Sequence, residues 1–273
     1  MLSRRDFCLC CVGSAFVPVA CNAYAPRATT YRSTLIDGLT PSPLVWAGRK
    51  WRCNMGSTWN RSMDHCLRLT ASRARFEIRP TPNDRSKDDD GVKLRSELSG
   101  SLPGNRERLP NGVPLWGALS FIHHRWGDPA GMATRTGGVH GQIHIGHTFG
   151  GSPALAFRRN ARGEFTVTTR GEHDPRSRVR YLDALSFDHA HDLVYRIVLH
   201  PSDGTLTAWL DGRQIVDVRG QSIGTQHAES FWAVGCYYAG GASCPVVAEF
   251  ANHRYPAQLD LSDRIMARPA WPK

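Results

Sequence analysis

Helical periodicity is almost absent from this chain of 273 residues, and that absence constrains its fold most strongly. Short runs rich in β-branched and aromatic residues follow one another, each bounded by Gly, Pro, Asn or Asp. Such runs are typical of β-strands. The sequence predicts strands over residues 68–80, 94–98, 114–126, 141–147, 153–159, 164–170, 193–200, 205–212, 213–220, 230–238 and 246–255.

Turn signals separate several of these runs. Asp203-Gly204 and Asp211-Gly212 are typical two-residue hairpin turns, and they predict a three-strand meander over residues 193–220. The stretch 160–163 predicts another turn. Many short strands without an internal repeat favour two packed antiparallel sheets. The expected fold class is therefore all-β, a single-domain β-sandwich of the jelly-roll, concanavalin-like type.

The first 23 residues have the pattern of an export signal. Arg4-Arg5 lie in SRRDFCL, which resembles the twin-arginine consensus, and a short apolar stretch and small residues follow. Cleavage before Cys21, as in a lipoprotein, is the alternative. We expect a domain over residues 24–273 that a bacterium exports to the periplasm or secretes. Neither this stretch nor any later apolar run is long enough to span a bilayer.

Four cysteines remain in the expected mature domain: Cys53, Cys66, Cys236 and Cys244. Four thiols in an exported protein suggest two disulfides, for which three connectivities exist. Pairing between near neighbours gives Cys53–Cys66 and Cys236–Cys244. A zinc site is the alternative, but the mature chain contains no pair of cysteines with the C-x2-C spacing.

The formal net charge of +10 indicates an anionic partner. Nucleic acid, anionic lipid and acidic polysaccharide all carry the required charge. The arginines are scattered along strand-like segments and form no block typical of a nucleic-acid-binding arm. An acidic polysaccharide is therefore the expected partner, with no nucleic acid and no membrane span. A basic surface that is merely solvated is the alternative.

The segment 140–147, HGQIHIGH, carries three histidines and a glutamine. A helix would bring the histidines to one face, where zinc could use them. However, its two glycines disfavour a helix and its two isoleucines favour a strand. Side chains alternate along a strand, so the isoleucines face the core. His140, Gln142 and His144 are then expected together on the open face.

Two further strands carry polar groups at alternate positions. In LRSEL, residues 94–98, Arg95 and Glu97 share the face opposite to the two leucines. In FWAVGCYY, residues 231–238, Tyr237 shares a face with a phenylalanine, an alanine and a glycine. Taken singly, these residues would be interpreted as a surface ion pair and a packing aromatic.

Together the three segments resemble the motifs of family-seven alginate lyases. These motifs are R-[ST]-E-L, Q-[IV]-H and Y-F-K-A-G-x-Y, and here RSEL, QIH and FWAVGCY occur in the same order between Arg95 and Tyr237. The meander over residues 193–220 looks more like heparin-lyase-I-like and glucuronan-lyase-like proteins of the same jelly-roll fold. Ala233 stands where the motif has lysine. Alginate, glucuronan and heparin-like polymers are therefore all candidate substrates.

The resemblance implies a lyase that cleaves a 4-linked uronic-acid polymer by β-elimination and leaves an unsaturated uronate end. In that reaction Arg95 and Gln142 neutralise the carboxyl group of the sugar. His144 is a candidate base, while Tyr237 protonates the leaving 4-oxygen and is also a candidate base. Glu97 orients Arg95 beside the substrate. Further contacts to the substrate are expected from His140, Arg75, Arg125 and Arg158.

The sequence requires no cofactor. The run Asp88-Asp89-Asp90 could bind calcium, as some relatives of this fold do, or it could be a solvated loop. Two other functions fit a β-sandwich. A glycoside hydrolase needs paired carboxylates, but the E-x-D-x-E signature is absent from the sequence. A lectin-like module that binds acidic glycans would need no catalytic groups.

Overall fold

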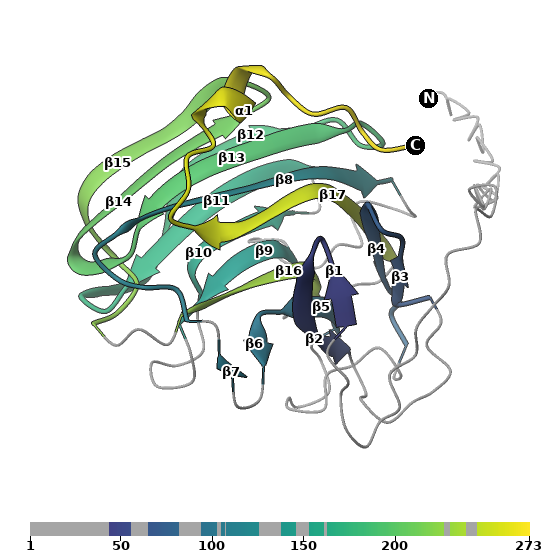
Figure 1. Cartoon of the computed structure of the whole chain (residues 1–273), viewed down its shortest axis with the longest axis horizontal. Coiled ribbons are helices and arrows are strands. Elements are labelled where there is room, and N and C mark those ends of the chain that lie inside the picture. The colour runs from purple at the N-terminus through teal and green to yellow at the C-terminus, as the bar shows by residue number, and fades with distance from the viewer. Residues whose placement is uncertain are drawn as a thin grey trace, which may run out of the picture.

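The computed structural model describes residues 44–55, 65–81, 94–102, 105–106, 108–125, 138–145, 153–160, 163–226, 230–238 and 245–273. The expected export signal, Cys244 and the run Asp88–Asp90 lie outside these ranges. Among the described residues, two antiparallel sheets pack face to face as a sandwich, which confirms the expected fold class (Figure 1). No helix in this part of the chain has the length and apolar composition needed to cross a membrane.

The larger sheet has eight strands, and the three strands that carry the sequence motifs are adjacent in it. In spatial order its strands are β1 (Leu44–Trp46), β2 (Arg49–Met55), β5 (Leu94–Ser99), β16 (Phe231–Tyr238), β9 (Gly138–His144), β10 (Pro153–Arg159), β11 (Glu164–Gly171) and β12 (Asp174–Ala184).

The second sheet has seven strands and contains the predicted meander at one edge. In spatial order they are β15 (Arg213–Ile223), β14 (His200–Leu210), β13 (His191–Val198), β8 (Pro114–His124), β17 (Val246–Ala257), β4 (Arg73–Ile78) and β3 (Leu67–Leu69). A small ribbon pairs β6 (Ser101–Leu102) with β7 (Asn105–Arg106), and the short helix α1 (Ser262–Met266) lies near the C-terminus.

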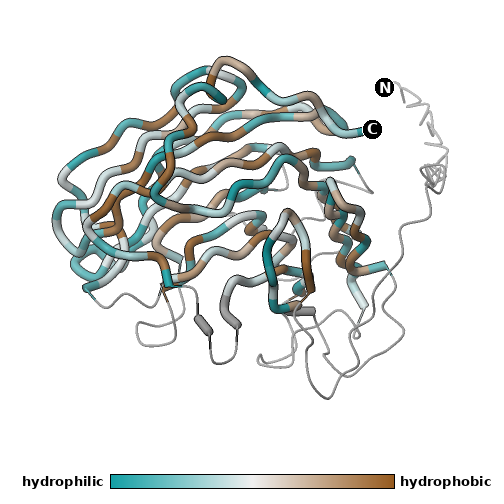
Figure 2. The backbone as a smooth tube through the Cα atoms, viewed as in Figure 1, coloured by the Kyte–Doolittle hydropathy of each residue, from teal (hydrophilic) through white to brown (hydrophobic). Residues whose placement is uncertain are grey.

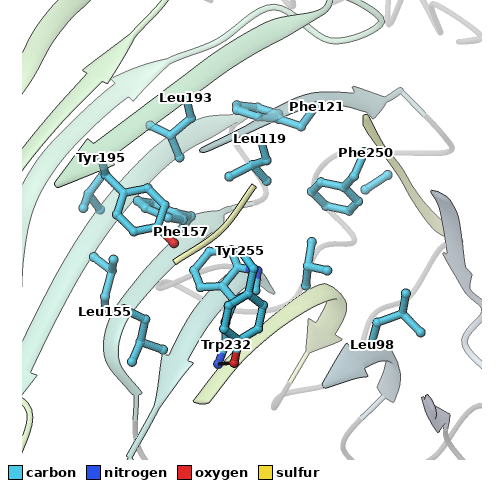
Figure 3. Close-up of a cluster of buried hydrophobic side chains, with 14 of the residues drawn as sticks. Leu98, Leu119, Phe121, Leu155, Phe157, Leu193, Tyr195, Trp232, Phe250 and Tyr255 are labelled. Atoms are coloured by element: carbon cyan, nitrogen blue, oxygen red, sulfur yellow. Dashed lines mark hydrogen bonds between the residues drawn. The ribbon is translucent and has the colours of Figure 1, made fainter. Parts of the chain in front are cut away.

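The core lies between the two sheets. Hydrophobic and hydrophilic segments are interspersed along the strands (Figure 2), and hydrophobic side chains from both sheets meet in the interior (Figure 3). Trp232 and Phe157 of the larger sheet face Tyr195 of the smaller one, with ring centroids 5.6 and 5.2 Å from that of Tyr195. Ile143 is fully buried, so the expected inward direction of the isoleucines is confirmed.

One predicted hairpin turn is confirmed and the other is wrong. Leu210 pairs with Arg213 across Asp211 and Gly212, whose φ angles of 52° and 81° are those of a tight hairpin. At the other site Val198 pairs with Thr205, so residues 199–204 form the connection. Strand β14 continues through this connection because its residues also pair with β15. Asp203-Gly204 is therefore not a two-residue turn.

The predicted disulfide between Cys53 and Cys66 does not form. Cys53 lies on β2 in the eight-stranded sheet, whereas Cys66 directly precedes β3 in the other sheet. Cys236 also carries a thiol, and its Sγ lies 3.8 Å from Nδ1 of His140 in the core. Burial raises the pKa of the Cys236 thiol. The described cysteines are therefore not linked by disulfides, and Cys244, the expected partner of Cys236, lies outside the described residues.

Candidate active site

The three sequence motifs lie on β5, β16 and β9, which are neighbours in the eight-stranded sheet. Residues directly opposite each other on paired antiparallel strands share one face. Tyr237 is paired with Arg95, and Phe231 is paired with His144. Gln142 is paired with Ala233, on the same face. Arg95, Gln142, His144 and Tyr237 therefore all lie on the open face, meaning the face turned away from the seven-stranded sheet.

Glu97 connects two of these groups at the floor of the open face. Its Oε1 accepts a hydrogen bond of 2.7 Å from Nε2 of Gln142, and its Oε2 lies 3.4 Å from Nε of Arg95. The carboxyl group is almost fully buried. Burial raises the pKa of Glu97, while the charge of Arg95 and the hydrogen bond from Gln142 work against that rise. Glu97 can therefore hold both neighbours in fixed directions.

Arg95 also contacts the phenol ring of Tyr237. The guanidinium carbon lies 4.5 Å from the ring centroid, within the range of a cation–π interaction. Nε of Arg95 is buried and donates no hydrogen bond, so its contact with Glu97 is electrostatic. The arrangement links Gln142, Glu97, Arg95 and Tyr237 in one continuous series of contacts.

His144 lies on the other side of Gln142, at the end of β9. Its imidazole stacks on the ring of Phe231, with centroids 5.0 Å apart and planes inclined by 18°. Phe231 was recognised from the sequence only as part of a motif. Its contact with His144 arises from the strand register, which the sequence does not specify.

The site is elongated along the strands. Phe231, which is level with His144, is separated from Tyr237 by six steps along β16. At roughly 3.3 Å per residue this separation is about 20 Å between backbones, somewhat less where the strand bulges. Gln142 lies between the two ends. His144 and Tyr237 therefore flank Gln142 instead of contacting each other.

Gly235 shapes the part of β16 that carries Tyr237. The pairing between β16 and β9 shifts between Val234 and Tyr237, as in a β-bulge. Gly235 has a φ of 147°, and a Cβ atom there would lie 2.3 Å from the carbonyl oxygen of Ser96 and 2.7 Å from Cα of Glu97. Only glycine permits this backbone conformation and this close approach of β5.

His140 points into the core, and the prediction that it lies on the open face is wrong. Gly141 pairs with Phe157, but Val139 pairs with the very next residue of β10, so β9 has an extra residue at this point. The bulge breaks the alternation on which the prediction depended. His140 is buried, its Nε2 lies 3.1 Å from Oη of Tyr238, and burial lowers its pKa to about 3.

Of the three arginines expected beside the substrate, only Arg158 reaches the open face. It pairs with Val139, which in turn pairs with Tyr237. Burial, followed by the charge of Arg170, lowers the pKa of Arg158 to about 10, whereas Tyr237 opposes this shift. The Arg158 guanidinium is therefore an electrostatic neighbour of Tyr237.

Arg75 and Arg125 belong to the seven-stranded sheet. Arg75 on β4 is buried and forms an ion pair of 2.7 Å with Glu77. Arg125 directly follows β8, and its guanidinium carbon lies 5.2 Å from the ring centroid of Phe187. Neither arginine lies beside Gln142 or Tyr237. The reason is that β4 and β8 belong to the seven-stranded sheet, whereas β9 and β16 belong to the eight-stranded sheet.

Sequence reasoning missed Arg170 and Thr168 on β11. Phe165 and Val167 of this strand are buried in the core, so Thr166, Thr168 and Arg170 alternate onto the open face. This alternation is present in the sequence and was a usable signal. The described residues contain no group of three or more His, Cys, Asp or Glu side chains that could hold a metal ion.

No protein-family model matches the chain, and no curated protein has a similar sequence. Solved structures with a similar fold include the family-7 alginate lyase A1-II' in complex with substrate, with a TM-score of 0.53 and 11% identity over 77% of this chain and 94% of that chain. The endo-β-1,4-glucuronan lyase from the fungus Trichoderma reesei has a TM-score of 0.51 and 10% identity over 77% of this chain and 88% of that chain. These likenesses show a common fold, in agreement with the resemblance inferred from the motifs.

Proposed function

We propose that the chain is a polysaccharide lyase that cleaves a 4-linked uronic-acid-containing polysaccharide by β-elimination, leaving an unsaturated uronate end. The observation that carries this proposal is the shared open face of Arg95, Gln142, His144 and Tyr237. Three strands far apart in sequence supply these groups. A fold in common with alginate and glucuronan lyases supports the same proposal.

Neutralisation of the sugar carboxylate is the first requirement. The C5 proton is only weakly acidic, and its removal builds negative charge on the adjacent carboxyl oxygens. Fixed donors aimed at those oxygens lower the barrier. Arg95 supplies a guanidinium, and Gln142 retains one amide N–H beyond the one that it donates to Glu97. Both groups are held in place by Glu97, so little reorganisation is needed during the reaction.

Proton transfer is assigned to the two groups that flank Gln142. A base takes the C5 proton, the electron pair forms the C4=C5 double bond, and the C4–O bond breaks. The departing 4-oxygen then accepts a proton. Histidine side chains titrate near neutral pH and are suitable bases. We assign the base to His144 and the acid to Tyr237, which are separate groups on the open face.

The charge of the open face supports an anionic polymer as the substrate. Arg52 of β2 is on this face, because it pairs with Ser99, which also pairs with Ala233. Arg95, Arg158 and Arg170 lie on the same face, and each of them is partly exposed. Alginate, glucuronan and heparin-like polymers are the candidate substrates. The twin-arginine motif at residues 4–5 supports action in the periplasm or outside the cell.

The test is an assay of the exported domain against a panel of polyuronates, with ultraviolet absorbance of the new C4=C5 bond as the readout. We expect His144→Ala and Tyr237→Phe to lose this signal while their circular dichroism remains that of the native protein. His173→Ala is the matched control, because His173 is exposed at the turn before β12. Binding of a polyuronate without any new absorbance would support the lectin-like alternative instead.

A further inference from the structure

Two arginines on neighbouring strands lie on the open face beyond Gln142. Arg158 on β10 donates from Nε to Oγ1 of Thr168 at 3.3 Å. Arg170 on β11 has a buried Nε atom without a hydrogen-bond partner. The charge of Arg170 acts on Arg158, so the two guanidinium groups lie within electrostatic range of each other.

Neither guanidinium is neutralised by a carboxylate in the part of the chain that the structure describes. Burial, which comes first, and the charge of Arg170 lower the pKa of Arg158 to about 10, and Tyr237 opposes them. Holding two like charges together at a partly desolvated site is unfavourable. A bound anion would remove that cost by neutralising the two guanidinium groups.

The position of this pair relative to the reaction centre follows from the strand register. Gln142 pairs with Ala156, and Ala156 pairs with Thr168, so these three residues are level on β9, β10 and β11. Gln142 and Thr168 are two strand spacings apart, so their backbones are separated by about 10 Å. The arginine pair therefore lies to one side of the reaction centre, across the strands and on the same face.

We propose that Arg158, Thr168 and Arg170 form an oxyanion subsite that binds the anionic group of a sugar beyond the point of cleavage. The subsite rests on the proposed function, because it is assigned to the same polymer. Carboxylate and sulfate ester share the required chemistry, since both accept hydrogen bonds from guanidinium groups. The threonine hydroxyl supplies an uncharged donor between the two cations.

The experiment uses the Tyr237→Phe protein so that the polymer stays intact during titration. Calorimetric affinities are measured for an unsulfated glucuronan oligosaccharide and for a sulfated heparin oligosaccharide of the same length. Arg170→Gln and Arg158→Gln test the subsite. Arg219→Gln is the matched control, because Arg219 is exposed on β15, beside Asp217 in the other sheet.

We expect Arg170→Gln and Arg158→Gln each to weaken binding about tenfold, as for the loss of one charge-assisted contact. Arg219→Gln should stay within about twofold of the parent protein. A loss confined to the sulfated ligand identifies a sulfate ester as the occupant, and a loss that includes the unsulfated ligand identifies a carboxylate. The subsite is refuted if the arginine variants bind both ligands as tightly as the control.

A stability measurement on the ligand-free protein separates an open subsite from a structural ion pair. We expect the unfolding temperature of Arg170→Gln to equal or exceed that of the parent, because one of two like charges is removed. A clear decrease would mean that the protein itself uses Arg170 and would overturn the subsite. If instead the subsite variants behave as expected while the wild-type protein makes no unsaturated product, the proposed function fails and the subsite stands.

Discussion

Glu97 is the residue through which the parts of the candidate site are held together. Its carboxyl group contacts both Gln142 and Arg95 and is almost fully buried. Gln at this position keeps an acceptor oxygen for Gln142 but removes the negative charge. A hydrogen bond to a charged group contributes about 1.5–3 kcal/mol and one between neutral groups about 0.5–1.5 kcal/mol, so the loss of the charge corresponds to roughly tenfold in rate. We expect Glu97→Gln to lower kcat by about this factor while the protein remains folded. Steady-state kinetics and circular dichroism check this, and unchanged kcat would contradict the positioning role.

Phe231 is expected to fix the orientation of the His144 imidazole. Stacked aromatic pairs contribute about 0.5–1.5 kcal/mol, so the loss of this contact should lower kcat roughly threefold to tenfold. We expect that decrease in Phe231→Leu, with little change in KM, and recovery in Phe231→Tyr, which keeps the ring. Equal kcat values for the leucine and tyrosine variants would show that the stacking has no positioning role.

At the residue scale, the alternation of side chains located Arg95, Gln142, His144 and Tyr237 on one face. The same rule failed for His140, because a single extra residue in β9 reverses the direction of the side chain. A bulge depends on hydrogen bonds to neighbouring strands, and the residues of β9 alone do not specify it. Arg75 is a second example, because its distance from the site follows from the assignment of β4 to the other sheet, which the residues of β4 alone do not specify.

At the scale of strands, the bulge at Gly235 is the feature that the site depends on most. A Cβ atom at this position would contact the backbone of β5, which cannot move without displacing Glu97. We expect Gly235→Ala to lower the free energy of unfolding by about 3 kcal/mol or more. Denaturant titration measures this change.

Gly48→Ala is the control for the Gly235 variant. Gly48 also has a positive φ, of 73°, but no atom lies within 4 Å of its would-be Cβ. Only the cost of the left-handed backbone remains, which is about 1–2 kcal/mol. Equal losses in the two variants would mean that backbone strain explains both, and that the close approach of β5 to Gly235 has no effect of its own.

Most strands could be predicted from sequence because they are short runs of buried β-branched and aromatic residues bounded by turn residues. The strand β12 escaped prediction for the opposite reason. It is an edge strand rich in arginine, and most of its side chains are exposed, so it lacks the alternation of buried and open positions. The turn at Asp211-Gly212 was predictable from its residues alone, whereas the turn at Asp203-Gly204 was overridden by pairing with β15.

At the scale of the whole molecule, buried histidines should make stability depend on pH. Burial lowers the pKa values of His140 and His253 to about 3 and that of His123 well below its usual range. These groups therefore stay neutral in the folded protein, whereas in the unfolded chain they take up protons near pH 6.5. Their contribution to stability is present above that pH and is lost as pH falls towards 3.

His124 acts in the opposite direction. Burial alone would lower its pKa, but hydrogen bonds and ion pairs with Glu249 and Asp188 outweigh burial and raise it. The contribution of His124 to stability is fully present below the pKa that this group has in the unfolded chain. It is lost as pH rises through the higher pKa that His124 has in the folded protein. Several buried histidines have lowered pKa values, whereas His124 has a raised pKa. We therefore expect the free energy of unfolding to fall as the pH is lowered from 6 to 4.

Denaturant titrations across this range check the expected pH dependence. His253→Gln should reduce the slope of the unfolding free energy against pH by the equivalent of about one proton, because glutamine does not titrate. The glutamine side chain still offers an acceptor to Nε1 of Trp232. A stability that is flat or rises on acidification would contradict the neutral state of the buried histidines.

The masses of the products test the central claim most directly. β-Elimination adds no water to the polymer, so the masses of the two fragments must sum to that of the intact oligosaccharide. We predict this result for a defined uronate oligosaccharide treated with the protein, with one fragment carrying the unsaturated end. Fragments whose summed mass exceeds the parent by one water would indicate hydrolysis, and recovery of the intact oligosaccharide, bound but uncut, would indicate a lectin; either would contradict a lyase.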